Sequence, residues 1–408
     1  MINVIGLGYI GLPTALILAK SGKQVVGTDV KSDIVDSLRE KKVTFEEPGM
    51  TGLLEKALEN EIEFKTHPVE SSFYIITVPT PYDSVSKKLD CKYVEDATKS
   101  VLEFAEDGAI IVLESTVTPG AIDKYIRPIV EDYIAKTGKK INLAHAPERV
   151  MPGNIIYEIE NNARTVGADS EEIALRVKEV YKSFCKSEIN LTDIKTAEMT
   201  KVVENTFRDV NIAFANELAK ICRQGGVDVN EVIRISNMHP RVNILSPGPG
   251  VGGHCISVDP WFLVGEYPLL TELIYKARKI NDSMPEYVLK RAYDIMKKNG
   301  LKDFTRVGIY GLTYKENVDD VRNSPTMQML EYQKENLASP LKVYDPMVKN
   351  DIVDNQYHNL DEFLADVDFV IIMVAHDEII QNLDLLKGKL VLDTRNIDKN
   401  NKWGFESL

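Results

Sequence analysis

A glycine-rich stretch near the middle of the chain, PGPGVGGHCISVDPWF at 247–262, contains a cysteine with an aspartate four residues further on. Loop glycines leave space for a ligand beside the Cys255 thiol, and its thiolate could attack an aldehyde to form a thiohemiacetal. Oxidation of that adduct would give a thioester, and its hydrolysis an acid. His254 and Asp259 are the nearest groups that could tune the thiol or activate water, and spacing does not choose between them. The alternative is a small structural cysteine.

A helical segment upstream, EMTKVVENTFRD, places Lys201 and Asn205 four residues apart and therefore on one face. An ammonium beside an amide could stabilise a developing alkoxide or the oxyanion of a tetrahedral intermediate. Both chemistries fit a dehydrogenase. The alternative is a solvated lysine and asparagine on a surface helix.

The N-terminus carries another glycine loop, VIGLGYIG, with Gly6, Gly8 and Gly11 in the G-x-G-x-x-G spacing between a predicted strand and a predicted helix. These glycines permit a tight turn and close backbone approach to a pyrophosphate, which the helix N-terminus stabilises. Asp29 ends the second predicted strand, where its carboxylate can accept bonds from ribose hydroxyls and repel a 2′-phosphate. The pattern predicts NAD rather than NADP. The nearby Lys31 is the one residue that argues against this preference. The alternative is a glycine turn that merely packs a helix on a strand.

These loops must be positioned by the elements around them. Over residues 1–190 short apolar runs alternate with helical stretches, which predicts a parallel sheet covered by helices on both faces. The predicted strands are INVIGLG, QVVGTDV, FYIITVP, AIIVLES and INLAHAPE. TVPTP (77–81) and ESTVTPG (114–120) put hydroxyls at the carboxyl edge of that sheet, where doubly wound folds bind ligands. Each could also be only a loop or a helix cap.

Strand signals largely vanish over 191–298, where a long helix is predicted from about 195 to 224, closed by Gly225 and Gly226. The alternation returns over 299–408 with RVGIYGLTY, LKVYDP, DFVIIMVAH and KLVLDTRN. The sequence therefore predicts an α/β fold. Two Rossmann-like, doubly wound domains, 1–190 and 299–408, are joined by a central all-helical domain, 191–298.

Composition limits the partners. The 408 residues carry a formal net charge of −13, which argues against non-specific binding to nucleic acid or anionic membrane. The chain starts directly in a predicted strand, and its longest apolar run, FVIIMVA, is far too short to span a bilayer. We therefore expect a cytoplasmic protein. The four cysteines lack CxxC or Cys/His ligand spacing, so neither disulfides nor a metal site are expected, and Cys222 is predicted to pack in a core.

Taken together, these motifs make the chain resemble the UDP-glucose/GDP-mannose dehydrogenase family over essentially its full length. The resemblance is carried by PERVMPG (147–153), HPRVNILSPGPGVGGHCISVDPWF and GLTYKENVDDVRNSP. It implies an NAD domain, a central helical domain and a UDP-binding domain. The implied reaction is a four-electron oxidation of a sugar C6 hydroxyl to a carboxylate with two NAD.

One departure from the UDP-glucose branch of that family concerns the sugar. That branch usually carries a second glutamate shortly after the PE pair, and Pro152 stands there in this chain. The resemblance therefore favours the N-acetylated-sugar branch, with UDP-N-acetyl-D-mannosamine as the expected substrate. UDP-N-acetylglucosamine or UDP-glucose is the nearest alternative. A two-electron hydroxyacid dehydrogenase is opposed by Cys255 and the C-terminal domain. A non-catalytic nucleotide sensor is opposed by Lys201, Asn205 and Cys255 together, which it would not need.

The resemblance also assigns roles. Cys255 becomes the nucleophile, Lys201 and Asn205 donors on the oxyanion side, and Asp259 a carboxylate that positions or deprotonates, while Thr116 and Glu148 match positions that hold or activate water. The expected NAD contacts are Gly6, Gly8, Tyr9, Ile10, Gly11, Asp29, Thr77, Pro79, Thr80, Thr116 and Arg322. The expected substrate contacts are Glu148, Arg149, Val150, Lys201, Asn205, Arg241, Gly248, Gly252, Lys315 and Arg395.

The predicted long helix carries apolar residues on more of its circumference than a small domain would cover. The resemblance makes this helix the core of a homodimer, or of a higher even homo-oligomer, in which Arg241 crosses to the partner's site.

Overall fold

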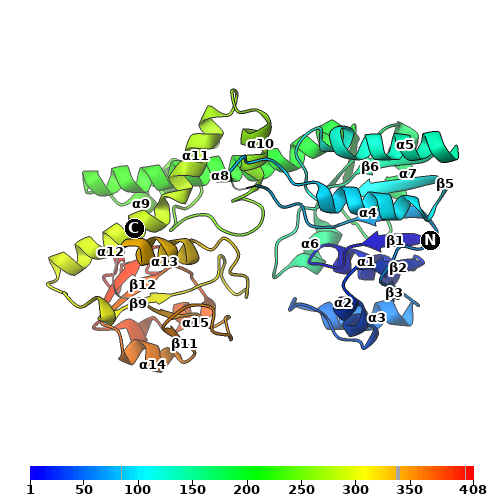
Figure 1. The fold of residues 1–408 in the computed structure, drawn as a ribbon. Helices are drawn as coiled ribbons and strands as arrows, with labels where there is room; N and C mark the ends of the chain where they lie inside the picture. Colours follow the sequence, from blue (N-terminus) through cyan, green and yellow to red (C-terminus); the bar gives the residue numbers. More distant parts are fainter. Residues whose placement is uncertain (84, 337–340, 400) are drawn as a thin grey trace. The chain divides into compact units, whose positions relative to one another are not determined.

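The structure of the protein is a computed structural model that describes residues 1–83, 85–336, 341–399 and 401–408. The chain forms two compact units, residues 1–204 with 265–267, and residues 205–264 with 268–408 (Figure 1). Each unit contains one sheet covered by helices.

The sheet of the first unit has eight strands in the order β3-β2-β1-β4-β5-β6-β7-β8. Their bounds are β1 Ile2–Ile5, β2 Val25–Thr28, β3 Glu63–Lys65, β4 Ser71–Ile76, β5 Ala105–Leu113, β6 Ile141–His145, β7 Arg164–Ala168 and β8 Ile189–Thr192. All four residues of β1 and of β2 are buried, as expected for strands with helices on both faces. The strand order reverses between β1 and β4, the topological switch point where doubly wound folds bind ligands.

One strand departs from the parallel sheet that the sequence predicted. β7 pairs antiparallel with β6, with Ala144 opposite Ala168 and His145 opposite Gly167, whereas every other neighbouring pair in the sheet is parallel. The sequence reading missed β3, β7 and β8, because short strands of mixed composition give little periodic signal. An antiparallel strand near the edge of a largely parallel sheet is a common variation. Here it brings the start of β7 to the carboxyl ends of β5 and β6.

Helices cover both faces of this sheet. Their bounds are α1 Gly11–Lys20, α2 Ser32–Arg39, α3 Met50–Glu59, α4 Lys92–Leu102, the π-helical turn η1 Ile122–Ile126, α5 Arg127–Thr137, α6 Ile155–Asn161 and α7 Glu171–Tyr181. α1 contacts α3 and α6, whereas α4 contacts η1 and α5, so the two groups form separate layers. α1 is buried from Gly11 to Ala19, as a helix between a sheet and further helices must be.

The longest helix, α8 Ile194–Gly225, begins in the first unit and ends in the second. It stops at the predicted pair of glycines, where Gly226 has φ +68°, a left-handed conformation that terminates helices. The other helices of this part are α9 Val229–Ser236, α10 Asp259–Glu266, α11 Glu272–Asp282 and α12 Met284–Lys298. Cys222 packs with Ala215, Ala219 and Ile233 in a buried cluster, as predicted.

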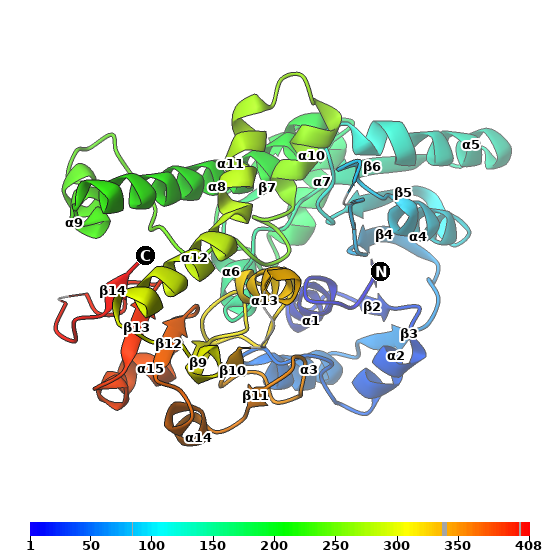
Figure 2. The same cartoon turned by 60° about the vertical axis from the view of Figure 1, so that its left-hand side comes forward.

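The second unit contains a six-stranded sheet in the order β11-β10-β9-β12-β13-β14, parallel throughout. Its elements are the 3₁₀ turn η2 Phe304–Arg306, β9 Val307–Tyr310, α13 Pro325–Asn336, β10 Lys342–Tyr344, β11 Gln356–Tyr357, α14 Leu360–Ala365, β12 Phe369–Ile372, α15 Asp377–Gln381, the 3₁₀ turn η3 Leu383–Leu386, β13 Leu390–Asp393 and β14 Glu406–Ser407. α12 and α13 share one buried cluster with the sheet, and α14 and α15 share another (Figure 2). The order reverses between β9 and β12, which marks a second switch point.

The predicted fold class is confirmed: two doubly wound α/β sheets with a helical segment between them in the chain. The boundaries predicted at residues 190 and 298 stay a prediction. Within the described ranges, no helix has the length and apolarity needed to cross a membrane.

Candidate active site

The N-terminal glycine loop lies at the switch point of the first sheet. Gly6 follows β1 with φ +93°, and a Cβ on Gly11 would stand 1.8 Å from the Gly6 carbonyl oxygen. Only glycine fits either position, so the loop exposes backbone where a side chain would otherwise stand. This is the cradle that a pyrophosphate requires.

The carboxylate of Asp29 closes one side of this cradle. Asp29 follows β2, and its two oxygens accept the N–H groups of Leu7 (2.8 Å) and Lys31 (3.0 Å). The side chain therefore lies beside the glycine loop with further lone pairs available for ribose hydroxyls. Tyr9 packs against Phe45 with ring centroids 4.3 Å apart, and Ile10 stands at the N-cap of α1.

Two further predicted loops meet beside the glycine loop. The hydroxyl of Thr77, directly after β4, lies 2.7 Å from the Gly6 carbonyl oxygen. Ser115, after β5, donates its hydroxyl hydrogen to the Val78 carbonyl at 2.6 Å. These bonds bring the segment holding Pro79 and Thr80 to the segment holding Thr116.

Glu198 of α8 fixes the end of the same Thr116 segment. Its carboxylate accepts the backbone N–H groups of Gly120 (2.5 Å) and Ile122 (2.9 Å). Burial raises the pKa of Glu198 to about 7, although these two bonds work in the opposite direction.

The predicted water-side glutamate belongs to a buried ion cluster. Glu148, after β6, bonds the guanidinium of Arg164 at 2.7 Å, and the same guanidinium bonds Glu114 at 2.9 Å. Arg149 turns to Thr165 (2.9 Å) and Glu204 (2.8 Å). Val150 packs against the main core of the unit.

Lys201 and Asn205 are both buried on α8, 7% and 6% exposed. Their burial excludes the solvated surface pair that the sequence left open. In the second unit, the Asn205 amide donates to the Asp259 carboxylate at 2.6 Å. Asp259 is 2% exposed and begins α10, so the bond holds its carboxylate in a fixed place.

Cys255 is exposed, whereas the other three cysteines, all among the described residues, are buried. Its carbonyl accepts the N–H groups of Val258 (3.0 Å) and Asp259 (2.8 Å), so the turn carrying the thiol leads directly into α10. An exposed thiol is what a substrate can reach.

The glycines before Cys255 let this loop pack against the segment after β9. A Cβ on Gly253 (φ +83°) would stand 2.7 Å from the Tyr314 ring, and one on Gly252 would stand 2.7 Å from the Asn323 carbonyl oxygen. The Gly253 N–H donates to the Arg322 carbonyl at 3.0 Å. Arg322 itself pairs with Asp320 at 2.6 Å. Desolvation and the charge of Arg322 lower the pKa of His254.

Two predicted substrate residues, Gly248 and Arg395, lie close together in this unit. An Arg395 guanidinium nitrogen lies 3.2 Å from where a Gly248 Cβ would stand, and Arg395 pairs with Glu316 at 3.7 Å. Glu316 follows Lys315 in the chain, so the Lys315 loop reaches Arg395 through Glu316. Arg241 does not join them: it is exposed, and its backbone N–H bonds its neighbour His239.

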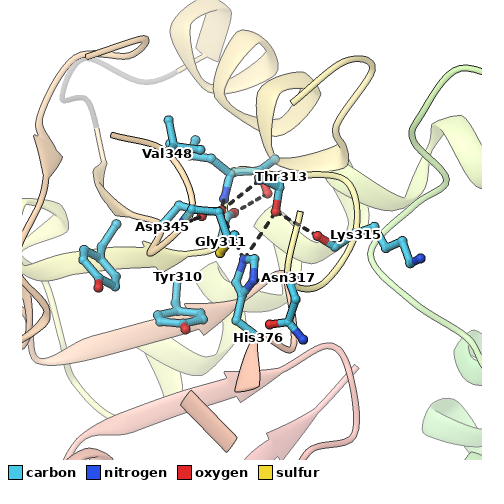
Figure 3. Close-up of polar contacts among 12 residues, drawn as sticks. Tyr310, Gly311, Thr313, Lys315, Asn317, Asp345, Val348 and His376 are labelled. Carbon is cyan, nitrogen blue, oxygen red and sulfur yellow. Dashed lines mark hydrogen bonds and ion pairs between the residues drawn. The ribbon is translucent and has the colours of Figure 1, made fainter. Parts of the chain in front are cut away.

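A buried network holds the Lys315 loop at the second switch point (Figure 3). Asp345, after β10, accepts the N–H groups of Leu312 (2.6 Å) and Thr313 (3.0 Å). His376, after β12, accepts the Asn317 N–H on Nδ1 at 3.0 Å, so its proton is on Nε2, which faces Asp345 at 3.2 Å. Burial would raise the pKa of Asp345, but the bonds from His376 and the backbone lower it. In Figure 3 the Lys315 side chain extends away from this network.

The sequence reading missed Glu114, Arg164, Asp345 and His376. Asp345 and His376 follow predicted strands, and position at a strand's carboxyl end is the signal that could have identified them. Glu114 is the first residue of the predicted ligand-side segment ESTVTPG (114–120) and directly precedes its serine and threonine. Arg164 had no such signal, because its strand was not predicted.

Comparison with known proteins identifies the family. Residues 1–185 match the NAD binding domain of the UDP-glucose/GDP-mannose dehydrogenase family, residues 195–283 its central domain, and residues 308–400 its UDP binding domain. The chain belongs to this family. It is an NAD-dependent UDP-sugar dehydrogenase, as predicted.

Named relatives and solved structures cover nearly the whole chain. The UDP-N-acetyl-D-mannosamine dehydrogenase of Methanococcus maripaludis is 42% identical, over 98% of this chain and 94% of its own. The enzyme of that name from Escherichia coli K12 is 37% identical, over 97% and 98%. The structure of a UDP-D-ManNAc dehydrogenase from Pyrococcus horikoshii has a TM-score of 0.91 and 36% identity, over 100% of this chain and 98% of its own.

The residues present fit the family's cofactor. The Gly6 and Gly11 cradle, which any Cβ would fill, suits a pyrophosphate, and the Asp29 carboxylate beside it suits a ribose without a 2′-phosphate. The structure thus offers the two features that distinguish NAD from a generic anion.

Proposed function

We propose that this dehydrogenase oxidises UDP-N-acetyl-D-mannosamine at C6 to UDP-N-acetyl-D-mannosaminuronate through a thioester on Cys255. The observation that carries the chemistry is the exposed Cys255 on a glycine loop, one turn from the Asn205–Asp259 pair. A dehydrogenase that stops at a two-electron step needs no nucleophilic thiol.

The proposed steps balance as follows. The C6 alcohol loses a hydride and a proton and becomes an aldehyde. The Cys255 thiolate adds to its carbon, and the resulting alkoxide takes up a proton to give a thiohemiacetal. Loss of a second hydride and of that hydroxyl proton gives a thioester. Water then adds to the thioester carbon, the C–S bond breaks, and the thiolate and the carboxylate product form as the two protons of the water are released to solvent. NAD, when bound, accepts the hydride of each oxidation, so two NADH form per sugar.

The chain's own residues serve these steps. Lys201 and Asn205 donate to the oxygen on C6 as negative charge develops there. Asp259, held by Asn205, orients the reacting groups, and Glu148 and Thr116 hold the water that attacks the thioester. Lys315 and Arg395 bind the anionic nucleotide, which explains how a protein of net charge −13 holds a pyrophosphate.

The choice of sugar rests on the relatives named for UDP-N-acetyl-D-mannosamine and on Pro152 in place of a second glutamate. UDP-N-acetylglucosamine and UDP-glucose would undergo the same chemistry. The domain division proposed with this function assigns NAD to 1–190, catalysis and dimerisation to 191–298, and the UDP-sugar to 299–408.

The test is the amount of NADH formed per sugar nucleotide consumed, with limiting UDP-N-acetyl-D-mannosamine and excess NAD. We expect two NADH per sugar, and less turnover in parallel reactions with UDP-N-acetylglucosamine and UDP-glucose. A ratio of one would remove the thioester, faster turnover of another sugar would reassign the substrate, and no NADH from any of the three would refute the proposal.

We also propose that the chain is a homodimer, or a higher even assembly, built on α8. Phe207, Phe214 and Ile221 recur every seven residues and are 62%, 52% and 60% exposed, an apolar stripe that one chain leaves uncovered. A second copy of the same helix would cover it symmetrically. Sedimentation equilibrium at micromolar concentration is expected to give at least twice the chain mass of 45.9 kDa, and a monomer would contradict the dimer.

A further inference from the structure

The ion cluster around Glu148 contains two residues that the proposed chemistry does not use. Arg164 is 4% exposed and Glu114 1% exposed, and neither lies on a glycine loop. The register of β7 against β6 explains how they meet Glu148. Because Ala144 faces Ala168 and His145 faces Gly167, continuing this antiparallel register places Arg164 opposite Glu148.

Both terminal nitrogens of the Arg164 guanidinium are bonded and two aromatic rings lie against it, whereas its Nε has no hydrogen-bond partner among the described residues. Nη1 bonds Glu114 Oε1 at 2.9 Å, and Nη2 bonds Glu148 Oε2 at 2.7 Å. Its carbon lies 4.7 Å from the centroid of the Tyr181 ring and 5.3 Å from that of Phe184. A planar guanidinium fixed in this way dictates where both carboxylates lie.

Glu148 is oriented from its other oxygen as well. Oε1 accepts the backbone N–H of Arg149, so both oxygens of this carboxylate are engaged. The cluster has one positive charge for two carboxylates, in a place with almost no solvent. Two buried like charges that share one cation do not both ionise easily.

We propose that Arg164 and Glu114 are positioning residues for Glu148: Arg164 orients the Glu148 carboxylate, and Glu114 shares with Glu148 the single positive charge of Arg164. This inference rests on the proposed function only where it concerns turnover. Burial is the main reason that the pKa of Glu114 rises to about 7, the Glu148 charge raises it further, and Arg164 opposes both.

Other charged groups near the cluster are engaged elsewhere. The Arg149 guanidinium bonds Thr165 and Glu204. The uncharged Thr14 of α1 donates to the second oxygen of Glu114 at 3.5 Å. His145 of β6 is neutral, because burial lowers its pKa to about 4. Tyr181 of α7, whose ring lies against the Arg164 guanidinium, is a further titratable group at the cluster, and burial raises its pKa well above the usual value.

The direct test is an infrared pH titration of the enzyme without substrates, following the band of protonated buried carboxyls. We expect the wild-type band to grow as the pH falls through about 7, and Glu114→Gln to remove its main component. Glu148→Gln should move that component to lower pH by about one unit or more, because a neighbouring negative charge is lost.

Glu198→Gln is the matched control, since Glu198 titrates in the same range and is bonded elsewhere. A Glu114 component that does not move in Glu148→Gln would overturn the coupling.

The second test is the pH profile of kcat. Glu114→Gln keeps an oxygen that accepts from Arg164 and fixes the neutral state that Glu114 takes as the pH falls through about 7, so the part of the kcat profile that follows this protonation should disappear. Arg164→Met should lower kcat and shift the acidic limb to higher pH, and Arg164→Lys should recover the limb but only part of kcat. A purely structural role would lower the yield of folded enzyme and leave the limb unmoved. If the wild type forms two NADH per sugar and the pH profiles of the variants coincide with its own, the positioning role alone is refuted. If the wild type shows no turnover, the proposed function is refuted, and the infrared titration then tests the coupling of Glu114 and Glu148 by itself.

Discussion

Replacing Cys255 with alanine is expected to abolish formation of the uronate while UDP-sugar and NAD still bind. Deleting a covalent nucleophile lowers kcat by a factor on the order of 10³ to 10⁶, because no other group can form the thioester. The Cys255 thiol is exposed, and an alanine there changes little of the packing around it. The measurement is uronate formed over time by chromatography, together with the dissociation constants of both ligands.

The matched control is Cys222→Ala, which removes a buried thiol that packs against Ala219 in the second unit. It should keep the ratio of two NADH per sugar. Alkylation with iodoacetamide gives an independent check, since Cys255 should react first and a bound UDP-sugar should protect it. Uronate formation by Cys255→Ala at the wild-type rate would eliminate the thioester and, with it, the proposed order of steps.

The glycine loop proposed to hold the cofactor could be predicted because its determinants are local in the sequence. The loop, the strand before it and the helix after it lie within residues 2–20, and Asp29 directly follows the next strand. The steric reason for each glycine, such as the 1.8 Å approach at Gly11, is a property of the turn itself. The same holds for the end of α8 at Gly225 and Gly226.

The buried ion cluster could not be predicted, because it depends on which strands are neighbours and in which direction they run. Glu114, Glu148 and Arg164 are as much as 50 residues apart and meet only because β7 is antiparallel to β6. The pairing of Asp345 with His376 likewise depends on the order of β9, β10 and β12. A sequence pattern gives a strand's existence more readily than its partner.

The chemistry of Lys201 and Asn205 illustrates a third case. Their helical spacing was visible in the sequence, but spacing alone fitted both a solvated face and a site. Their burial excludes the solvated surface face, because a lysine side chain is seldom fully buried unless it is paired with another group.

Replacing Arg278 with methionine is expected to lower the free energy of unfolding of the second unit by about 3–5 kcal/mol, the cost of leaving a buried charge without its partner. Arg278 of α11 is 1% exposed and bonds Asp209 of α8, which is fully buried. Asn281 also bonds Asp209, and the Asn216 amide links Asn281 to the Gly248 N–H at 2.8 Å. The same network therefore supports the loop that leads to Cys255.

The sign of the pH dependence follows from Asp209. Burial already raises its pKa, with Arg278 as the main opposing charge, so the methionine variant should raise it further. A carboxyl whose folded-state pKa lies above its unfolded value binds more protons when folded, so stability falls as the pH rises between the two values.

Denaturant unfolding of Arg278→Met followed by circular dichroism should show a loss of stability, relative to wild type, that is largest at neutral and alkaline pH and shrinks in acid. Arg234→Met, which breaks the exposed pair with Glu231, is the control and should leave the stability nearly unchanged. Adding Asp209→Asn to Arg278→Met should restore part of the loss, and a deficit unchanged by that second substitution would show that lost packing, rather than an unpaired carboxylate, is responsible.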